Sequence, residues 1–316
     1  MDLTNVTGLP YPIWYAFNEL YNSHPPVAPD EFTATQLLKS SKEIYLNREH
    51  SDEVVKDVQD VMGMIDGTCR HEVMRRIIEN LGDERYVCER RFSRNINVEV
   101  NGVQVPIKIS GGVDMYYRDD SGLHIIDYKN TNQASIDKAR EGEDTHYLDQ
   151  MYIYAWLMEP ELGERPLDAT IVAQNKRLLK REIDLSDPTK VPAQQMTFSL
   201  DDMNYQNALI EKIKGKIENV LSCRIPECSD EEMWMTERLY GVKKPENQKY
   251  NKKCSSMAEA NQFLIEKGWA GKGYTITEIV PEPKKCNGYC DYLPWCKQGQ
   301  EAVERYRESN KENSNG

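Results

Sequence analysis

The sequence lacks the features that would place a protein in or across a membrane. Its richest early apolar run, residues 11–17, is far shorter than the roughly 20 residues that a membrane-spanning helix needs. The first residues, beginning with Met1 and Asp2, lack the basic start and the apolar stretch of a signal peptide. No internal repeat is visible. We therefore expect a cytoplasmic protein without a membrane partner.

The chain also has fewer basic than acidic residues. The 316 residues include 40 lysines and arginines against 52 aspartates and glutamates, which gives a formal net charge of −12. This balance argues against a protein that coats nucleic acid regardless of sequence, although an enzyme can still bind DNA through a local basic groove. Hydrophobic residues make up 39% of the chain, which is enough for one large domain or two ordinary ones.

The pattern of apolar residues predicts alternating helices and strands. A capped short helix begins at Thr33 and runs towards Leu46, and a longer helix covers residues 51–81 and ends at Gly82. Residues 86–130 alternate like a meander of about five strands, over 86–94, 96–100, 103–109, 113–117 and 124–128. Hairpin turns are expected at residues 101–102 and 119–122. The elements expected further on are a helix over 147–158, strands over 169–173 and 178–185, and helices over 203–221 and 257–267. This order indicates an α/β fold with a central mixed sheet flanked by helices.

Changes in composition along the chain predict its domain organisation. We expect an N-terminal helical segment over 1–50, an α/β core over 51–223, a cysteine-rich appendage over 224–300, and a helix end with a disordered tail over 301–316. The chain has eight cysteines, and in an intracellular protein these are more often thiols or metal ligands than disulfides.

Two aspartates and a lysine lie on the strands of the second predicted hairpin. Asp114 follows Gly111-Gly112-Val113, and Asp127 follows the apolar pair Ile125-Ile126. A short turn between the strands brings both carboxylates to one end of the sheet, where they form a hard oxygen site suited to Mg²⁺ or Mn²⁺. Residues two apart in a strand share a face, so Lys129 points the same way as Asp127. An acidic metal site beside an ammonium group suits phosphodiester hydrolysis.

These motifs resemble the PD-(D/E)xK nucleases, and in particular their RecB-like exonuclease branch, which includes CRISPR-associated type-four exonucleases and many phage relatives. The resemblance implies a restriction-endonuclease-like core over 51–223, in a bacterial cell or a phage-infected host. It also implies that the helical His71, in Gly67-x-x-x-His71, is a metal ligand together with Asp114, Asp127 and the carbonyl of Tyr128. Gln150 and Tyr154 match the branch's Gln-x-x-x-Tyr motif, which implies that they contact the substrate phosphate and support Lys129.

The cysteines near the C-terminus match a further mark of this branch, an iron–sulfur cluster that closes the appendage. Cys286, Cys290 and Cys296 are closely spaced, and thiolates at such spacing favour a 4Fe–4S cluster or Zn²⁺. The branch usually supplies its first cysteine upstream of the histidine, but this chain has Ser40 and Ser41 there. Cys228 is our choice for the fourth ligand, and Cys254 and Cys69 remain alternatives.

The combined motifs predict a metal-dependent DNA exonuclease that acts in recombination, repair or end processing. We expect a DNA substrate with a single-stranded end, and either a homo-oligomer or a DNA-processing protein partner. A basic hairpin with Lys176-Arg177 and Lys180-Arg181, and a second group of lysines between Lys243 and Lys253, are candidates for phosphate contact. The alternative is a non-catalytic or partner-dependent DNA-binding subunit with a nuclease fold.

Overall fold

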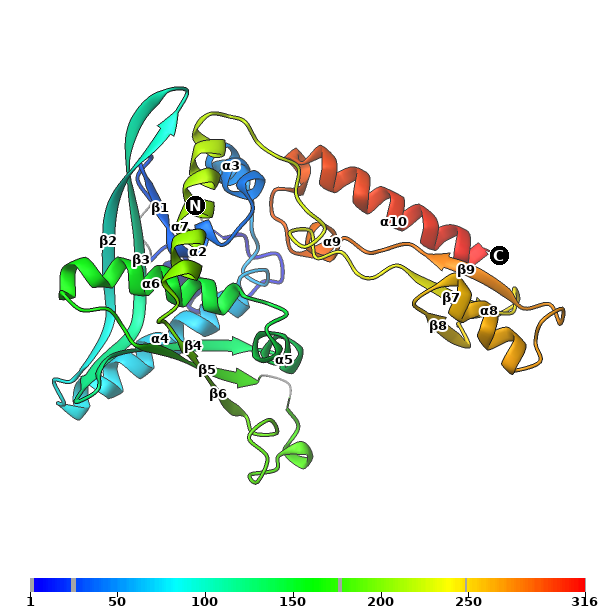
Figure 1. Cartoon of the computed structure of the whole chain (residues 1–316), viewed down its shortest axis with the longest axis horizontal. Helices are drawn as coiled ribbons and strands as arrows, with labels where there is room; N and C mark the ends of the chain where they lie inside the picture. The colour runs from blue at the N-terminus through cyan, green and yellow to red at the C-terminus, as the bar shows by residue number, and fades with distance from the viewer. Residues whose placement is uncertain (1–2, 24–26, 176–177, 248, 316) are drawn as a thin grey trace. The chain divides into compact units, whose positions relative to one another are not determined.

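The computed structural model describes residues 3–23, 27–175, 178–247 and 249–315 (Figure 1). The chain divides into two compact units. The first comprises Met1–Lys39 and Val55–Arg224, and the second comprises Ser40–Val54 and Ile225–Gly316. No helix among the described residues combines the length and the apolar composition needed to span a bilayer.

The first unit is built on a six-stranded sheet. Its strands are β1 (Glu31–Thr33), β2 (Tyr86–Val100), β3 (Val103–Asp119), β4 (Gly122–Thr131), β5 (Asp168–Asn175) and β6 (Ala193–Ser199), in the order β1-β3-β4-β5-β6 with β2 paired to β3. The pairs β1–β3 and β4–β5 are parallel, and the other three are antiparallel. The predicted α/β fold with a mixed central sheet is therefore confirmed.

The meander consists of three long strands, so the prediction of about five was wrong. The expected breaks at Asn95 and at Gly111 do not interrupt the ladder, because Asn95 pairs with Lys108 and Gly111 with Phe92. The predicted hairpin turn is present: Asn101 and Gly102 have φ of 52° and 82°. These are the left-handed values that a type I′ turn requires at both central positions.

Six α-helices connect or cover these strands in the described part of the first unit. They are α1 (Tyr11–Tyr21), α2 (Ala34–Leu37), α4 (Met62–Leu81), α5 (Gln133–Glu141), α6 (His146–Leu162) and α7 (Met203–Leu221). Helices α4, α6 and α7 pack against β2. The predicted helices over 147–158 and 203–221 are confirmed as α6 and α7, and Asp202 caps the second by accepting bonds from the N–H groups of Asn204 and Tyr205.

Two helix predictions were too long. The helix expected from Thr33 to Leu46 is two helices, because Ser40 starts a new one, α3 (Ser41–His50), by capping the N–H of Glu43. In the region 51–81 only the 3₁₀ turn η1 (Ser51–Glu53) and α4 are helical. Between them the Asp57 carboxylate accepts bonds from the N–H groups of Val6 and Gln59, which competes with helix formation.

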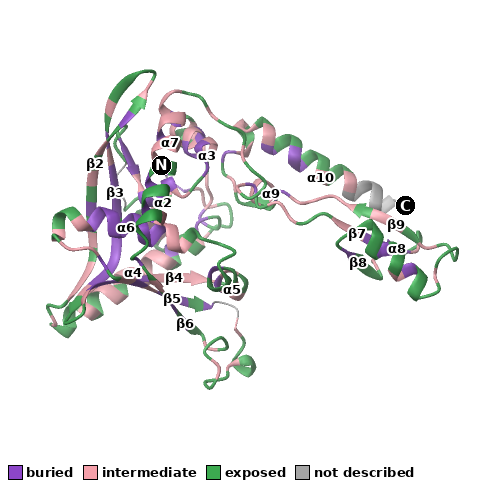
Figure 2. Cartoon of the chain, viewed as in Figure 1, coloured by how far each residue is buried: buried purple, intermediate pink, exposed green. Residues whose placement is uncertain are grey.

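Buried residues gather along β3 and α6 (Figure 2). Every residue from Gln150 to Met158 is buried, so α6 forms the centre of the core. The strand predicted over 178–185 was wrong, because the described part of that region contains only the 3₁₀ turn η2 (Lys180–Glu182). The next strand is β6, whose Ala-Gln-Gln-Met sequence carries little apolar signal because it lies at the sheet edge.

The second unit contains a small sheet and several helical segments. The sheet has the order β8-β7-β9, with β7 (Leu239–Lys243), β8 (Lys252–Cys254) and β9 (Thr275–Ile279). The predicted helix over 257–267 is confirmed as α8 (Met257–Glu266). The remaining elements are α3, η1, α9 (Lys284–Gly288), η3 (Leu293–Trp295) and α10 (Lys297–Asn315). Helix α10 continues through the segment for which the composition favours a disordered tail.

Candidate active site

The site lies where β3 and β4 separate. Their ladder stops at the pair Met115 and Ile126, and beyond this point β4 pairs only with β5. The next residues are Asp114 on β3 and Asp127 on β4, so the two carboxylates lie at the opening of the fork. The Asp114 Oδ2 atom accepts a hydrogen bond of 2.8 Å from the N–H of Tyr128, an amide that the ended ladder leaves without a strand partner.

Lys129 lies beside Asp127 on β4. Its Nζ atom is 2.5 Å from Asp127 Oδ2, while Asp127 Oδ1 is buried without a hydrogen-bond partner among the described residues. Burial lowers the pKa of Lys129, but the attraction of Asp127 and Asp114 outweighs it and holds this pKa above the ordinary lysine value. Lys129 is therefore an ammonium group at neutral pH, and it can donate hydrogen bonds or stabilise negative charge but cannot act as a base.

His71 approaches the same carboxylates from α4. Its Nδ1 atom lies 3.4 Å from Asp114 Oδ1 and 3.3 Å from Glu89 Oε1. The ligand atoms of His71, Glu89 and Asp114 all lie within 4.8 Å of one another, so the three side chains could hold a metal ion. The hydrogen bond to Glu89, more than the charge of Asp114, raises the pKa of His71.

Glu89 is a site residue that the sequence analysis missed. The β2–β3 register pairs Cys88 with Met115 and Arg90 with Val113, so Glu89 falls opposite Asp114, and its φ is 51°. A glutamate in this left-handed region is uncommon, and such strain is found most often at functional sites. The residue pattern gave no signal for it, because a glutamate on a strand is most often an exposed surface residue and its φ is not visible in the sequence.

Burial and repulsion give the carboxylates properties suited to a cation. Burial, followed by the charge of Asp127, raises the pKa of Asp114 to about 7. Two buried carboxylates at a fork repel each other, and a divalent cation between them would remove that repulsion. The orphaned Oδ1 of Asp127 supplies an unused ligand atom. The residues present therefore fit a divalent cation.

Gln150 and Tyr154 lie on α6, against the back of β3. Gln150 Nε2 donates a bond of 2.7 Å to the Tyr154 hydroxyl, and the Tyr154 ring packs on Gly111. Burial, and then the charges of Asp127 and Asp114, raise the pKa of Tyr154. The Lys129 ammonium lies 6.0 Å from the centroid of the Tyr147 ring. The Tyr128 ring meets His71 edge-on at 6.2 Å.

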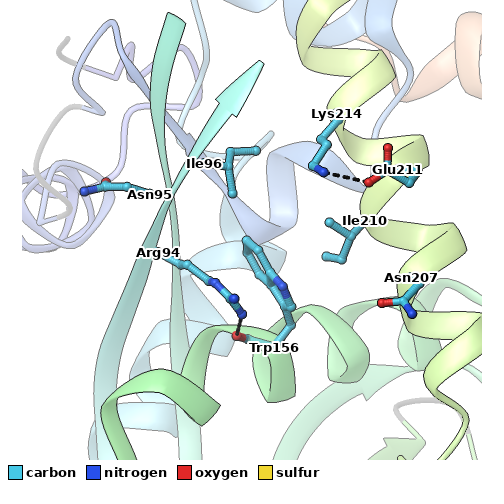
Figure 3. Close-up of a pocket in the computed structure, with 8 residues that line it drawn as sticks. All are labelled: Arg94, Asn95, Ile96, Trp156, Asn207, Ile210, Glu211 and Lys214. Carbon is cyan, nitrogen blue, oxygen red and sulfur yellow. Dashed lines mark hydrogen bonds and ion pairs between the residues drawn. The ribbon is translucent and has the colours of Figure 1, made fainter. Parts of the chain in front are cut away.

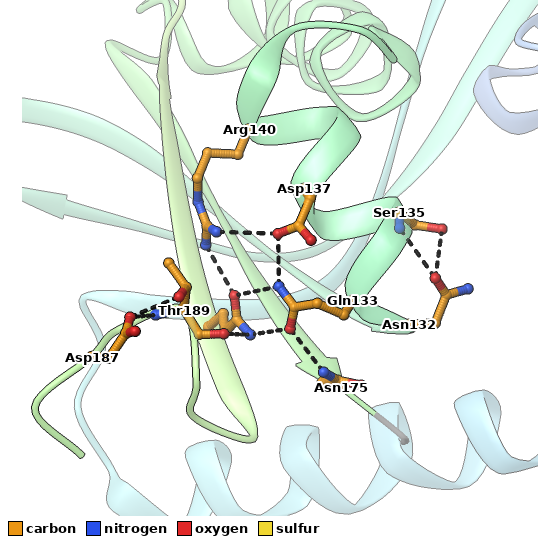
Figure 4. Close-up of polar contacts among 9 residues, drawn as sticks. Asn132, Gln133, Ser135, Asp137, Arg140, Asn175, Asp187 and Thr189 are labelled. Atoms are coloured by element: carbon orange, nitrogen blue, oxygen red, sulfur yellow. Dashed lines mark hydrogen bonds and ion pairs between the residues drawn. The ribbon is translucent and has the colours of Figure 1, made fainter. Parts of the chain in front are cut away.

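A polar network fixes the segment that follows β4 (Figure 4). Gln133, at the start of α5, donates to Asp137, and its Oε1 atom accepts bonds from Asn175 at 2.9 Å and Gln194 at 2.7 Å. Gln194 is almost fully buried and also accepts a bond from Arg140. Helix α5 is thereby held to the ends of β5 and β6, which supports the end of β4 that carries Lys129.

The pocket drawn in Figure 3 lies away from these residues. This pocket of about 330 Å³ is lined by residues of β2, α6 and α7, including Arg94, Trp156 and Lys214. The Arg94 guanidinium lies 4.5 Å from the centroid of the Trp156 ring. None of the catalytic or metal-binding candidates lines this pocket.

The cysteine candidates divide between the two units. Cys228, Cys286, Cys290 and Cys296 all belong to the second unit. A Cβ atom on Gly299 would lie 3.4 Å from both the Cys286 and the Cys296 sulfur atoms, so these two thiols lie close together. The alternatives pack elsewhere: Cys69 lies in an apolar cluster with Ile65, and Cys254 in another with Val242.

The basic hairpin expected at Lys176 to Arg181 is not a hairpin in the described residues. Lys176 and Arg177 themselves lie outside the described residues. Lys180 and Arg181 belong to the 3₁₀ turn η2 and are exposed.

Comparison with known proteins identifies a family. Residues 20–297 match a family model described as the PD-(D/E)XK nuclease superfamily. The solved structure of the protein SSO0001 is similar to this chain with a TM-score of 0.45 and 15% sequence identity, over 66% of this chain and 86% of that one. No curated protein matches the chain. The family match covers most of the chain and includes every candidate site residue described above.

Proposed function

Because the chain belongs to the PD-(D/E)XK nuclease superfamily, we propose that it is a divalent-cation-dependent deoxyribonuclease of the RecB-like branch that degrades DNA from an end. The observation that carries this proposal is the meeting of Asp114, Asp127, Lys129 and His71 at the β3–β4 fork. The two carboxylates are buried, and Asp127 Oδ1 has no hydrogen-bond partner among the described residues. Without a cation this arrangement would destabilise the fold.

Asp114, Asp127 and His71 would hold Mg²⁺ or Mn²⁺, with the Tyr128 carbonyl and Glu89 as further ligands. When bound, such a cation polarises a phosphate oxygen and makes water a stronger nucleophile at neutral pH. Lys129 keeps its proton and donates hydrogen bonds to the attacking water or to the phosphate oxygens that gain charge. Departure of the 3′ oxygen leaves a 5′ phosphate on the product. Gln150 and Tyr154 act as positioning residues for this face of the site.

We further propose that Cys228, Cys286, Cys290 and Cys296 hold a 4Fe–4S cluster. Burial raises the pKa of Cys286 to about 11, and the neighbouring Cys290, Cys296 and Cys228 contribute to the same shift, which supports Cys228 over Cys254 and Cys69. Zn²⁺ held by the same four thiolates is the alternative, and the test below distinguishes the two.

The nuclease is tested with end-labelled single- and double-stranded DNA and either Mn²⁺ or Mg²⁺. We expect wild-type protein to degrade DNA, and Lys129→Ala to be slowed by at least about a hundredfold while it still binds the cation. Lys212→Ala, an exposed lysine on α7, is the matched control and should retain full activity. The position of the surviving label gives the direction of degradation.

An inactive wild-type protein with an intact cluster would contradict the nuclease proposal and favour a partner-dependent DNA-binding subunit. The cluster is tested separately in protein purified without oxygen. Absorption near 400 nm with about four irons per chain supports it, whereas a colourless, zinc-loaded protein contradicts it.

A further inference from the structure

The small sheet of the second unit has two different faces. Val242 of β7 and Cys254 of β8 are buried with Ala260 and Leu264 of α8, so this helix covers one face. Neighbouring residues in a strand point to opposite sides, which places Gly241 and Lys243 on the other face. Lys253 of β8 is the register partner of Gly241 and lies on that same face.

The Tyr250 ring packs against this second face. A Cβ atom on Gly241 would be 2.2 to 2.8 Å from three carbons of the Tyr250 ring, a distance at which the two cannot coexist. Glycine at 241 therefore lets the ring rest directly on the backbone of β7. Tyr250 as a whole is half-buried, so part of the residue remains exposed.

Lysines surround this ring. The Lys243 and Lys253 ammonium groups lie 5.5 Å and 5.9 Å from its centroid, within the range of a cation–π contact. Lys249 and Lys253 are exposed, and neither forms an ion pair within the part of the chain that the structure describes. Residues 239–281 contain seven lysines against four glutamates, in a chain whose formal net charge is −12.

We propose that Gly241, Lys249, Tyr250 and Lys253, here called the Tyr250 platform, bind single-stranded DNA. A base stacks on the Tyr250 ring, and Lys249 and Lys253 contact the phosphates on either side. Every base has a π-face, so this binding tolerates any sequence. A duplex hides its base faces, and this favours a single strand. The inference rests on the proposed function for its choice of DNA, and it adds a binding site outside the β3–β4 fork.

The test measures fluorescence anisotropy of labelled oligo-dT with the full-length protein, in EDTA so that cleavage does not occur. We expect Lys249→Glu/Lys253→Glu to weaken binding about tenfold or more. We also expect it to reduce the slope of log K against log salt by about 1.4, because each phosphate contact on a single strand contributes about 0.7. Tyr250→Ala should weaken binding about fivefold or more, and Tyr250→Phe should bind like wild type because it keeps the ring.

The matched control is Lys138→Glu/Lys212→Glu, which makes the same change in charge at two exposed lysines of the first unit. If both double variants lose the same affinity for oligo-dT, only long-range charge contributes, and binding at the Tyr250 platform is contradicted. Tighter binding of duplex DNA or of oligo-U would also overturn it. Cleavage without platform-dependent binding contradicts only this inference. Platform-dependent binding without cleavage contradicts only the proposed nuclease.

Discussion

At the scale of single residues, the site combines strain with unfavourable charge. Glu89 adopts a left-handed backbone conformation that costs an ordinary residue about 1 kcal/mol or more. Its carboxylate adds negative charge beside His71 and Asp114. A cation held by these three side chains, as proposed above, would offset the repulsion between the carboxylates.

We predict that Glu89→Gly weakens cation binding without lowering the stability of the fold. Glycine removes the carboxylate and accepts a φ of 51° without strain, so the free energy of unfolding should stay level or rise by up to about 1 kcal/mol. The Mn²⁺ concentration needed for half-maximal cleavage should rise about 10- to 100-fold. Asn101→Gly, at a φ of 52° in the hairpin turn, is the control and should leave this concentration unchanged. An unaltered Mn²⁺ requirement in Glu89→Gly would remove Glu89 from the site.

His124 makes the free energy of unfolding depend on pH, independently of the active-site cation. Its ring nitrogens lie 2.9 Å from Asp168 and 3.2 Å from Asp119, and its ring stacks on Tyr117. Burial lowers the pKa of His124, but the two carboxylates outweigh burial and hold this pKa above the ordinary value. The resulting stabilisation is fully present below the unfolded-state pKa of about 6.5 and is lost as the pH rises through the folded-state pKa.

We therefore predict that His124→Gln is more harmful at low pH. The loss in free energy of unfolding, measured by urea denaturation, should be larger at pH 5.5 than at pH 8.5. The difference should persist in EDTA, which excludes an effect of the active-site cation. A loss of equal size at both pH values would show that His124 contributes through packing alone.

At the scale of elements, the contact between β3 and α6 sets the back of the site. Gly111 leaves room for the Tyr154 ring: a Cβ atom there would lie 2.9 Å from Tyr154 Cε1 and 3.1 Å from Leu157 Cδ1. Gly112, the next residue, has nothing within 4 Å of such a Cβ atom. Neither glycine has a positive φ, so space is the difference between them.

This contrast predicts different effects of the same substitution. Gly111→Ala should lower the free energy of unfolding by about 1–3 kcal/mol, because Tyr154 and Leu157 are fully packed and must move. It should also lower cleavage, because Tyr154 and its hydrogen-bonded partner Gln150 shift behind the fork. Gly112→Ala should change neither by a measurable amount. Chemical denaturation and the end-label assay read out both effects, and equal stability of the two variants would refute the packing argument.

At the scale of the whole molecule, each of the two units has apolar packing of its own among the described residues. The first unit buries its centre along β3 and α6, and the second has its own apolar cluster around Val242. Within the second unit, Lys285 pairs with Glu43 at 2.5 Å, and the Asn47 side chain bonds the Tyr292 hydroxyl. These contacts join Ser40–Val54 to the cysteine-bearing C-terminal segment, although the two are far apart in sequence.

Separate cores predict separate responses to loss of the cluster. Cys286→Ser should remove the absorption near 400 nm and lower the melting temperature of one calorimetric transition, that of the second unit. The other transition should remain within about 2 °C of its wild-type value. Cys223→Ser, an exposed cysteine outside the four, is the control and should change neither. A single transition that shifts as a whole would contradict independent cores.

The sequence by itself determined the kind of fold, and it predicted which charged residues meet at the fork. Periodicity is a local property, so the helices of the core and the Asn101-Gly102 turn followed from neighbouring residues. Periodicity indicated the strand boundaries poorly, because β2 and β3 continue through the residues at which breaks were expected. It also missed β6, an edge strand whose polar residues resemble a loop.

The tertiary structure alone decided which distant residues meet. Glu89 comes next to His71 because β2 pairs with β3 and α4 packs on β2, and its unusual φ leaves no mark on the pattern of residue types. The same holds for residues 40–54, which form one compact unit with the C-terminal segment. Local patterns determine which residues form helices and strands. Which of these elements come into contact depends on packing across the whole chain.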